Sequence, residues 1–265
     1  LARVVPTTVN ARLIGIPPES REQFKSSTEV VGAFLGGLGG LEKVARTRRA
    51  SRRMLEEIAR FRDIISQRRR RPENDLISAM VQAQNDGLLG EEEVLAICME
   101  MLFAGQETAT DLIGNGLLSL LRHPAQLQRL RDDPALIKSA VEELLRFESP
   151  VQMTTRLAVS DIALHGKVIQ SGQKVALCLG AANRDPAQFT APDNLDVART
   201  NNRHVAFGYG IHYCMGAALA RIEAQTVFAQ LIRGFRRLRL ASEQVEWKDT
   251  PIFRGLKSLP VVLER

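Results

Sequence analysis

The sequence has few cysteines and no long apolar run, and these two absences exclude several classes of protein. Its three cysteines (Cys98, Cys178 and Cys214) are odd in number and widely spaced, unlike the framework of a disulfide-stabilised domain. This usage predicts a reducing, cytoplasmic compartment. No run of about 18 apolar residues occurs, so we expect no membrane-spanning helix. Internal repeats, low-complexity segments and an N-terminal signal-peptide pattern are also missing.

Acidic residues are outnumbered, with 30 Asp and Glu against 36 Lys and Arg, which gives a net charge of +6. The excess arginine is concentrated in three stretches, at 46–53, 68–71 and 233–239. Basic patches can bind nucleic acid. No aromatic-basic motif accompanies these ones, and glutamates are interspersed in the first two helical patterns. We therefore predict solvated charge and no nucleic-acid partner.

The chain has 265 residues, of which 45% are hydrophobic, enough for one large domain or two small ones. It begins at Leu1 in LARVVPTTVNARLIGIPPE, which has the pattern of a helix interior, so we expect a segment upstream. Helical periodicity dominates as far as Pro150 and is longest over 91–122. Short alternating runs between 156 and 180 predict β-hairpins. The predicted fold class is mainly α with small β-sheets.

The stretch FGYGIHYCMG (207–216) places one cysteine among three glycines, directly before a helical pattern over 217–235. Unpaired N–H groups and the positive end of the dipole at a helix N-terminus stabilise a thiolate. The glycines let the backbone approach a flat partner. Cys214 is therefore a candidate metal ligand or nucleophile. A buried structural cysteine and a zinc site with His204 and His212 remain alternatives.

The stretch AGQETAT (104–110) interrupts the apolar part of the longest helical pattern with an acid and a hydroxyl, Glu107 and Thr108. A threonine can donate to the carbonyl one turn earlier and open the helix locally. Such a groove beside polar groups suits proton relay. An exposed polar face with a tolerated glycine is the alternative.

The stretch EELLR (142–146) places Glu143 and Arg146 three residues apart on one helix face. This spacing favours an ion pair. Most such pairs are solvated, so the motif is weak by itself.

Taken together, these stretches resemble the cytochrome P450 family, of the soluble bacterial type. AGQETA is similar to its oxygen-activation segment, with Ala109 where a second threonine is frequent and Gln106 in place of a frequent histidine. Glu143 and Arg146 match its ExxR motif, and Arg199 matches the arginine that completes its structural triad. NRDP (183–186) and FRGLKSLPV (253–261) are further landmarks. The cysteine loop matches the haem-binding signature at Phe207, Gly208, Gly210, His212, Cys214 and Gly216.

The resemblance implies that residues 1–265 form one partial cytochrome P450 domain, its C-terminal haem-binding portion. The N-terminal strands and first helices of the family fold have no counterpart in this sequence. The parts expected are a long central helix (91–122), a Glu-Arg helix (134–147), a meander (183–206), the haem loop (207–216) and a following helix (217–235).

The resemblance also assigns roles to single residues. Haem b, iron protoporphyrin IX, is expected with the Cys214 thiolate as axial ligand, and Phe207 is expected beside that sulfur. His212 and Arg156 match contacts to the haem propionates, although Arg156 also fits a plain strand-surface charge. Glu107 and Thr108 are the expected catalytic pair. The remaining cofactor contacts expected are Gly208, Gly216, Ala104 and Gly105; the expected substrate contacts are Leu102, Phe103, Val151, Gln152, Met153, Ile252 and Phe253.

The activity that the resemblance implies is a monooxygenase that activates O2 to hydroxylate a small, largely hydrophobic molecule. No flavin or iron–sulfur motif is present, so electrons are expected from a ferredoxin or flavodoxin-type partner. Arg233, Arg236 and Arg237 suit an acidic partner of that kind; solvated charge is the alternative. Two other functions stay open: a truncated, non-catalytic remnant that binds haem weakly or not at all, and a P450 catalysing a non-monooxygenase reaction.

Overall fold

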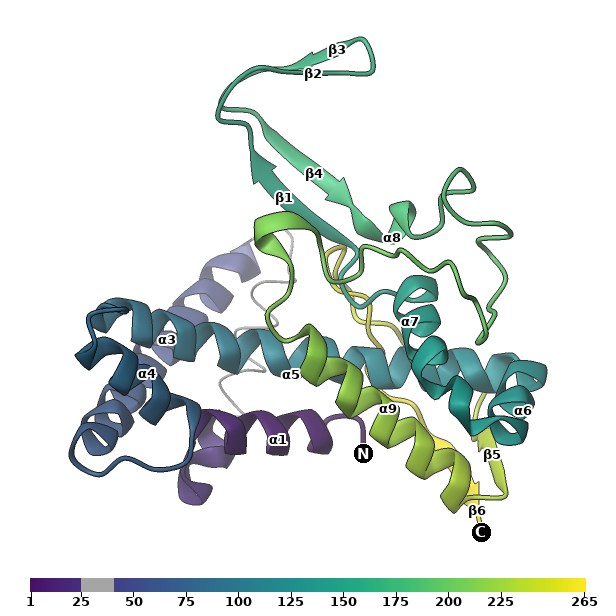
Figure 1. Cartoon of the computed structure of the whole chain (residues 1–265), viewed down its shortest axis with the longest axis horizontal. Helices are drawn as coiled ribbons and strands as arrows, with labels where there is room; N and C mark the ends of the chain where they lie inside the picture. Colours follow the sequence, from purple (N-terminus) through teal and green to yellow (C-terminus); the bar gives the residue numbers. More distant parts are fainter. Residues whose placement is uncertain (25–40) are drawn as a thin grey trace. The chain divides into compact units, whose positions relative to one another are not determined.

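The computed structural model describes residues 1–24 and 41–265, with side chains for all of them except 41–47. They form two compact units, residues 1–110 and residues 111–265, whose boundary falls within one long helix, α5 (Glu91–Arg122). The structure is mainly helical with small β-sheets (Figure 1), which confirms the predicted fold class. In the described ranges, none of the helices has the length and apolarity needed to cross a membrane.

The first unit is helical, and capping residues mark the C-terminus of one of its helices and the N-terminus of another. Gly15 terminates the first helix in a left-handed conformation (φ 101°) that glycine adopts without strain, and its N–H donates to Ala11 O. Asp75 caps a later helix by accepting a hydrogen bond from Ser78 N. Besides the first part of α5, the elements are α1 (Val4–Ile14), the 3-10 turn η1 (Pro18–Ser20), α3 (Leu41–Arg70) and α4 (Leu76–Asn85).

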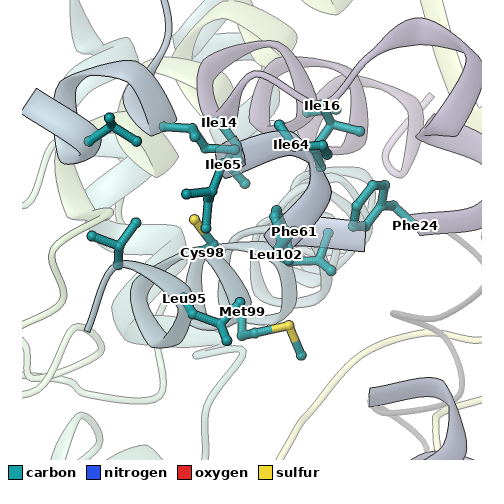
Figure 2. Close-up of a cluster of buried hydrophobic side chains, with 14 residues drawn as sticks. Ile14, Ile16, Phe24, Phe61, Ile64, Ile65, Leu95, Cys98, Met99 and Leu102 are labelled. Carbon is teal, nitrogen blue, oxygen red and sulfur yellow. The ribbon is translucent and has the colours of Figure 1, made fainter. Parts of the chain in front are cut away.

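A buried apolar cluster forms the core of this first unit (Figure 2). It draws side chains from α1, α3, α4 and α5 and from the loops beside them. Cys98 lies inside it, and burial raises the pKa of this thiol to about 12, so it stays an inert, neutral side chain. The labelled members are Ile14, Ile16, Phe24, Phe61, Ile64, Ile65, Leu95, Cys98, Met99 and Leu102.

The second unit contains the rest of α5, further helices and all the described strands. The helix predicted over 134–147 is shorter than expected, because Asp133 caps a 3-10 turn before the α-helix begins at Ile137. The helical elements are α6 (Pro124–Asp132), η2 (Pro134–Leu136), α7 (Ile137–Phe147), α8 (Leu179–Ala182), η3 (Gly210–His212) and α9 (Ala217–Gly234).

The described strands of the second unit pair into three two-stranded antiparallel sheets, β1 with β4, β2 with β3, and β5 with β6. His165 and Gly166 both have positive φ in the tight turn between β2 and β3, as two-residue hairpins require. This hairpin extends beyond the β1–β4 ladder (Figure 1). The strands are β1 (Met153–Leu157), β2 (Ile162–Leu164), β3 (Lys167–Ile169), β4 (Lys174–Cys178), β5 (Arg237–Leu240) and β6 (Val261–Glu264).

Two glycines in the last turns of α5 differ in the space around them, and this difference gives a prediction. A Cβ at Gly116 would lie 2.6 Å from Phe228 Cζ and 3.1 Å from Leu144 Cδ1. We expect Gly116→Ala to lower the free energy of unfolding by about 1–3 kcal/mol, because a close-packed core does not yield freely. Gly114→Ala is the matched control: its Cβ meets Leu256 Cδ1 at 4.0 Å. Higher helix propensity should then raise stability by up to about 1 kcal/mol.

Urea unfolding curves of the two variants measure this difference. Equal effects of the two substitutions, in either direction, would contradict the packing explanation.

Candidate functional site

The loop 207–216 is a tight turn that ends at Gly216, the residue directly before α9. Cys214 N donates to Phe207 O at 3.0 Å, so the two ends of the turn are joined by the backbone. Gly208 and Gly210 have φ of +74° and +69°, a region that favours glycine. The short 3-10 turn η3 begins at Gly210 itself and ends at His212, before Cys214. Backbone geometry thus explains two of the three glycines.

Cys214 is exposed on this loop, so it is not a buried structural cysteine. Large apolar side chains beside it in the sequence are exposed too: Tyr209 (86%), Ile211 (98%) and Met215 (70%). The third glycine, Gly216, is the N-cap residue of α9, and a Cβ there would come within 3.9 Å of Cys214 Sγ. The loop therefore presents one thiol within an apolar surface at the beginning of a helix.

Phe207 and Tyr213, at the two ends of the loop, contact one arginine from α9. Arg221 Cζ lies 4.5 Å from the centre of the Phe207 ring, and Arg221 Nη1 donates to Tyr213 Oη at 3.2 Å. The same guanidinium donates from Nε to Glu142 Oε1 at 2.7 Å and from Nη2 to Glu142 Oε2 at 2.9 Å. This two-point pairing of guanidinium and carboxylate links α9 to α7 next to the loop.

His204 completes this group of side chains, which we name the Glu142 cluster (Glu142, His204 and Arg221). His204 Nε2 lies 3.1 Å from Glu142 Oε2, and its Nδ1 accepts a hydrogen bond from Ala206 N at 3.2 Å. Burial alone would raise the pKa of Glu142, but the hydrogen bonds from His204 and Arg221 outweigh it and lower that pKa to about 2. Glu142 is therefore an anion at any physiological pH.

Both ring nitrogens of His204 are engaged in these bonds, which leaves neither for a metal. No group of three or more His, Cys, Asp or Glu suited to a metal ion occurs among the described residues. The zinc alternative with His204, His212 and Cys214 therefore has no support. Sequence reasoning missed the Glu142 cluster, since its members lie 17 to 79 residues apart; the one signal was a second glutamate beside Glu143.

Glu143, Arg146 and Arg199 come together in the second unit. Glu143 Oε2 accepts from Arg146 Nε at 2.8 Å and from Arg199 Nε at 3.0 Å, and the Glu143 and Arg146 side chains have no exposed surface. Asp196 N and Asn202 Nδ2 also donate to Glu143. The carboxylate thus accepts hydrogen bonds on both oxygens from the meander.

Arg146 satisfies the backbone of the same meander. Besides its two bonds to Glu143, it donates to the carbonyls of Asn183, Pro192 and Asn194 at 2.8–3.2 Å. All five N–H donors of the guanidinium are therefore used. A segment with little regular structure is fixed by one buried side chain from α7.

In the first unit, side chains bond backbone carbonyls of α5 close to the predicted catalytic pair, Glu107 and Thr108. Thr108 Oγ1 donates to Ala104 O, one turn earlier, at 2.8 Å. Asn10, buried on α1, donates from Nδ2 to Met101 O at 2.7 Å, and the space beside Gly105 is filled by the same amide. Side chains thus bond two helix carbonyls here. Asn10 was not predicted, because its partner lies 91 residues away in the sequence.

The segments predicted to contact substrate partly come together. Gln152 N donates to Ile252 O at 2.8 Å, and Val151 pairs with Phe253 in an antiparallel bridge, so residues a hundred positions apart lie side by side. Met153 begins β1. In the first unit Phe103 is half-buried, whereas Leu102 has no exposed surface. The Leu102 side chain lies on the face of α5 that packs into the core, and its contact with substrate stays a prediction.

The two predicted propionate contacts lie on separate elements of the second unit. His212 is exposed at the end of η3. Arg156 is half-buried on β1, opposite Val175, and its Nη1 donates to Thr154 Oγ1 and Thr155 O. Both side chains carry donors suited to carboxylates.

Glu223, on α9, gives a pH-dependent prediction. The side chain is 5% exposed, burial raises its pKa to about 7, and its Oε1 has no hydrogen-bond partner among the described residues. The Glu223 carboxyl group therefore binds its proton more tightly in the folded state than in the unfolded state. The stability that the protonated Glu223 contributes is complete below pH 4.5, the ordinary pKa of this group, and is lost as the pH rises through 7.

We therefore expect Glu223→Gln to remove this loss. In urea unfolding from pH 4.5 to 8, the variant should gain stability over the parent as the pH rises, by up to about 3 kcal/mol above pH 7. A difference independent of pH would show that Glu223 titrates normally in the folded state.

Comparison with known proteins places this fold and loop in one family. The family model described as cytochrome P450 matches residues 40–260. The chain is 42% identical over 258 residues to the biotin biosynthesis cytochrome P450 of Bacillus subtilis (strain 168), covering 97% of this chain and 64% of that protein. It spans 62–64% of the length of the first curated relatives that it matches.

Two solved structures show the same fold. P450BioI, in complex with an acyl carrier protein ligated with hexadec-9Z-enoic acid, has a TM-score of 0.94 and 40% identity, covering all of this chain and 67% of that one. Myxobacterial CYP267B1, in complex with myristic acid, has a TM-score of 0.91 and 40% identity over all of this chain and 65% of that one. The chain therefore belongs to the cytochrome P450 family and has the fold of that family.

Proposed function

We propose that the protein is a haem-thiolate monooxygenase, with Cys214 as the axial ligand of the haem iron. The observation that carries this proposal is the exposed Cys214 thiol, presented by a glycine-shaped loop at the N-terminus of α9 in a chain of the cytochrome P450 family. Sequence relatives and solved neighbours of the same family support it.

The residues present fit a haem. A haem would bring most of the ligands of its iron with it, so the chain would have to supply one further donor, and the soft thiolate of Cys214 would suit iron in this role. The apolar side chains exposed around Cys214 offer a surface that matches a flat hydrophobic ring. His212 and Arg156 provide donors for the two propionates. A zinc ion, by contrast, would need about four protein ligands.

The haem, when bound, supplies the one-electron and O2 chemistry that protein side chains lack. The chain's own residues would bind the haem and keep the segments around it in position. Cys214 would donate its thiolate to the iron and Phe207 would lie beside that sulfur, while the buried Glu143 and Arg146 keep the meander in place. Glu107 and Thr108 handle protons: the Thr108 hydroxyl holds a proton at Oγ1, and the Glu107 carboxylate takes up and releases protons from water.

For the substrate, we propose a small, largely hydrophobic molecule that contacts residues 151–153 and residues 252–253 of the second unit. Two solved neighbours contain fatty-acyl ligands, which favours an apolar substrate over a polar one. Electrons are proposed to come from a separate acidic ferredoxin or flavodoxin-type protein. The basic residues Arg233, in the last turn of α9, and Arg236 and Arg237, just beyond it, support this choice.

Thr108→Ala tests the monooxygenase reaction itself. In the haem-loaded chain with a ferredoxin and its reductase, we expect product formed per electron consumed to fall about tenfold or more, with haem content unchanged. Thr108→Ser keeps the hydroxyl and should retain most of the coupling. Unchanged coupling in Thr108→Ala would favour a reaction other than O2 activation through this hydroxyl.

A further inference from the structure

We propose that the Glu142 cluster is a positioning device that holds the loop 207–216 from beneath and so sets the orientation of Cys214. This inference rests on the proposed function, since orientation matters only if Cys214 ligates iron. It concerns residues outside the Glu143–Arg146–Arg199 triad. Glu142 and Glu143 are neighbours on α7, yet each holds a different segment of the chain.

Arg221 is the connecting residue of the cluster. Its guanidinium is held by both oxygens of Glu142, and the same planar group lies against the Phe207 ring. It also donates to Tyr213 Oη, and Tyr213 directly precedes Cys214. The arginine thus contacts the first residue of the loop and the residue next to the thiol. These two contacts restrain the aromatic side chains at both ends of the backbone segment 207–213, which leads directly to Cys214.

His204 fixes the entry to the same loop. Its side chain is 3% exposed, with Nε2 at Glu142 and Nδ1 accepting from Ala206 N. These partners assign the proton to Nε2. The ring centre also lies 6.1 Å from that of Phe207. Glu142 therefore orients the segment before the loop through His204 and the segment after it through Arg221.

Glu142 and Glu143 also differ in how far their side chains are buried. Glu143 has no exposed surface, whereas the Glu142 side chain is 27% exposed and its partner Arg221 28%. A partly exposed pair contributes less to global stability than a buried one. The Glu142 cluster should therefore affect the loop more than the folding of the whole unit, and this difference can be measured.

Glu142→Gln keeps the size of the side chain and removes its charge. By hydrogen–deuterium exchange of the 265-residue chain without added haem, we expect the amides of 207–216 to exchange about tenfold faster or more, with those of α7 and α9 little changed. After addition of haem, the share of bound haem with a thiolate-type Soret band in the reduced, CO-bound state should fall several-fold.

Glu148→Gln is the matched control. Glu148, at the end of the same helix, pairs with Arg254 at 2.5 Å, and Arg254 lies 3.8 Å from the Trp247 ring, so carboxylate, arginine and aromatic ring repeat the same arrangement. We expect loop exchange and the Soret band to stay as in the parent. Arg221→Lys keeps the charge but loses the planar fork, and should behave like Glu142→Gln.

Unchanged exchange of 207–216 in both Glu142→Gln and Arg221→Lys would overturn the inference. So would a uniform increase over residues 111–265, which would assign the cluster to general stability. If Glu142→Gln fails to fold, Arg221→Lys decides alone. If the parent chain binds no haem, the proposed function fails, but the exchange experiment still tests whether the cluster positions the loop.

Discussion

Replacement of Cys214 by alanine is expected to abolish the thiolate-type Soret band of the reduced, CO-bound protein. The physical reason is that Cys214 is an exposed thiol on a loop shaped for close approach, whereas Cys98 is buried with a pKa raised to about 12. Without this thiolate a bound haem would lose the protein donor proposed for its iron, so haem content per chain should fall severalfold or the band should move to the position typical of other ligands.

Cys178→Ala is the control for this experiment. Cys178 is also exposed but ends β4, so its loss should leave both haem content and the thiolate-type band as in the parent. A thiolate-type band that persists in Cys214→Ala would contradict the assignment of the ligand. A parent chain that is folded yet firmly free of haem would instead favour the alternative of a non-catalytic remnant.

Replacement of Arg146 by alanine is expected to give the largest loss of stability in the second unit. The variant leaves the Glu143 carboxylate buried without its closest partner and frees three meander carbonyls from their donors. Removing one member of a buried ion pair costs about 3–5 kcal/mol. Urea unfolding followed by circular dichroism measures this loss, and hydrogen exchange should place it in residues 183–199 first.

Arg129→Ala is the matched control, because Arg129 pairs with Asp196 of the same meander while both side chains are nearly half exposed. Such exposed pairs contribute about 0–1 kcal/mol. If Arg146→Ala and Arg129→Ala lowered stability equally, burial would not be the reason for the effect, and the proposed structural role of Arg146 would be contradicted.

Motifs with local causes could be predicted from the sequence. The glycines of the cysteine loop were expected to shape its backbone, and those at 208 and 210 have positive φ; Gly15 and Asp75 cap helices by chemistry of the same local kind, although neither was predicted. The helix over 134–147 was less well predicted: periodicity does not show that Asp133 caps a 3-10 turn before the α-helix begins.

Features that depend on partners far along the chain could not be predicted in this way. Leu102 and Phe103 are both large and apolar, and only packing shows that one is buried in a core while the other keeps exposed surface. Asn10 contacts a carbonyl 91 residues away. Nothing in the local pattern around either position indicates such a contact.

The sequence by itself determined the family, the mainly helical class and the candidate ligand Cys214, because these depend on residue types at short, fixed spacings. Only the tertiary structure decided what the two neighbouring glutamates of EELLR do. Glu143 is buried with Arg146 under the meander, and Glu142 pairs with Arg221 beneath the cysteine loop. Successive helix residues point in directions about 100° apart, so adjacent carboxylates meet different partners once distant segments pack around the helix.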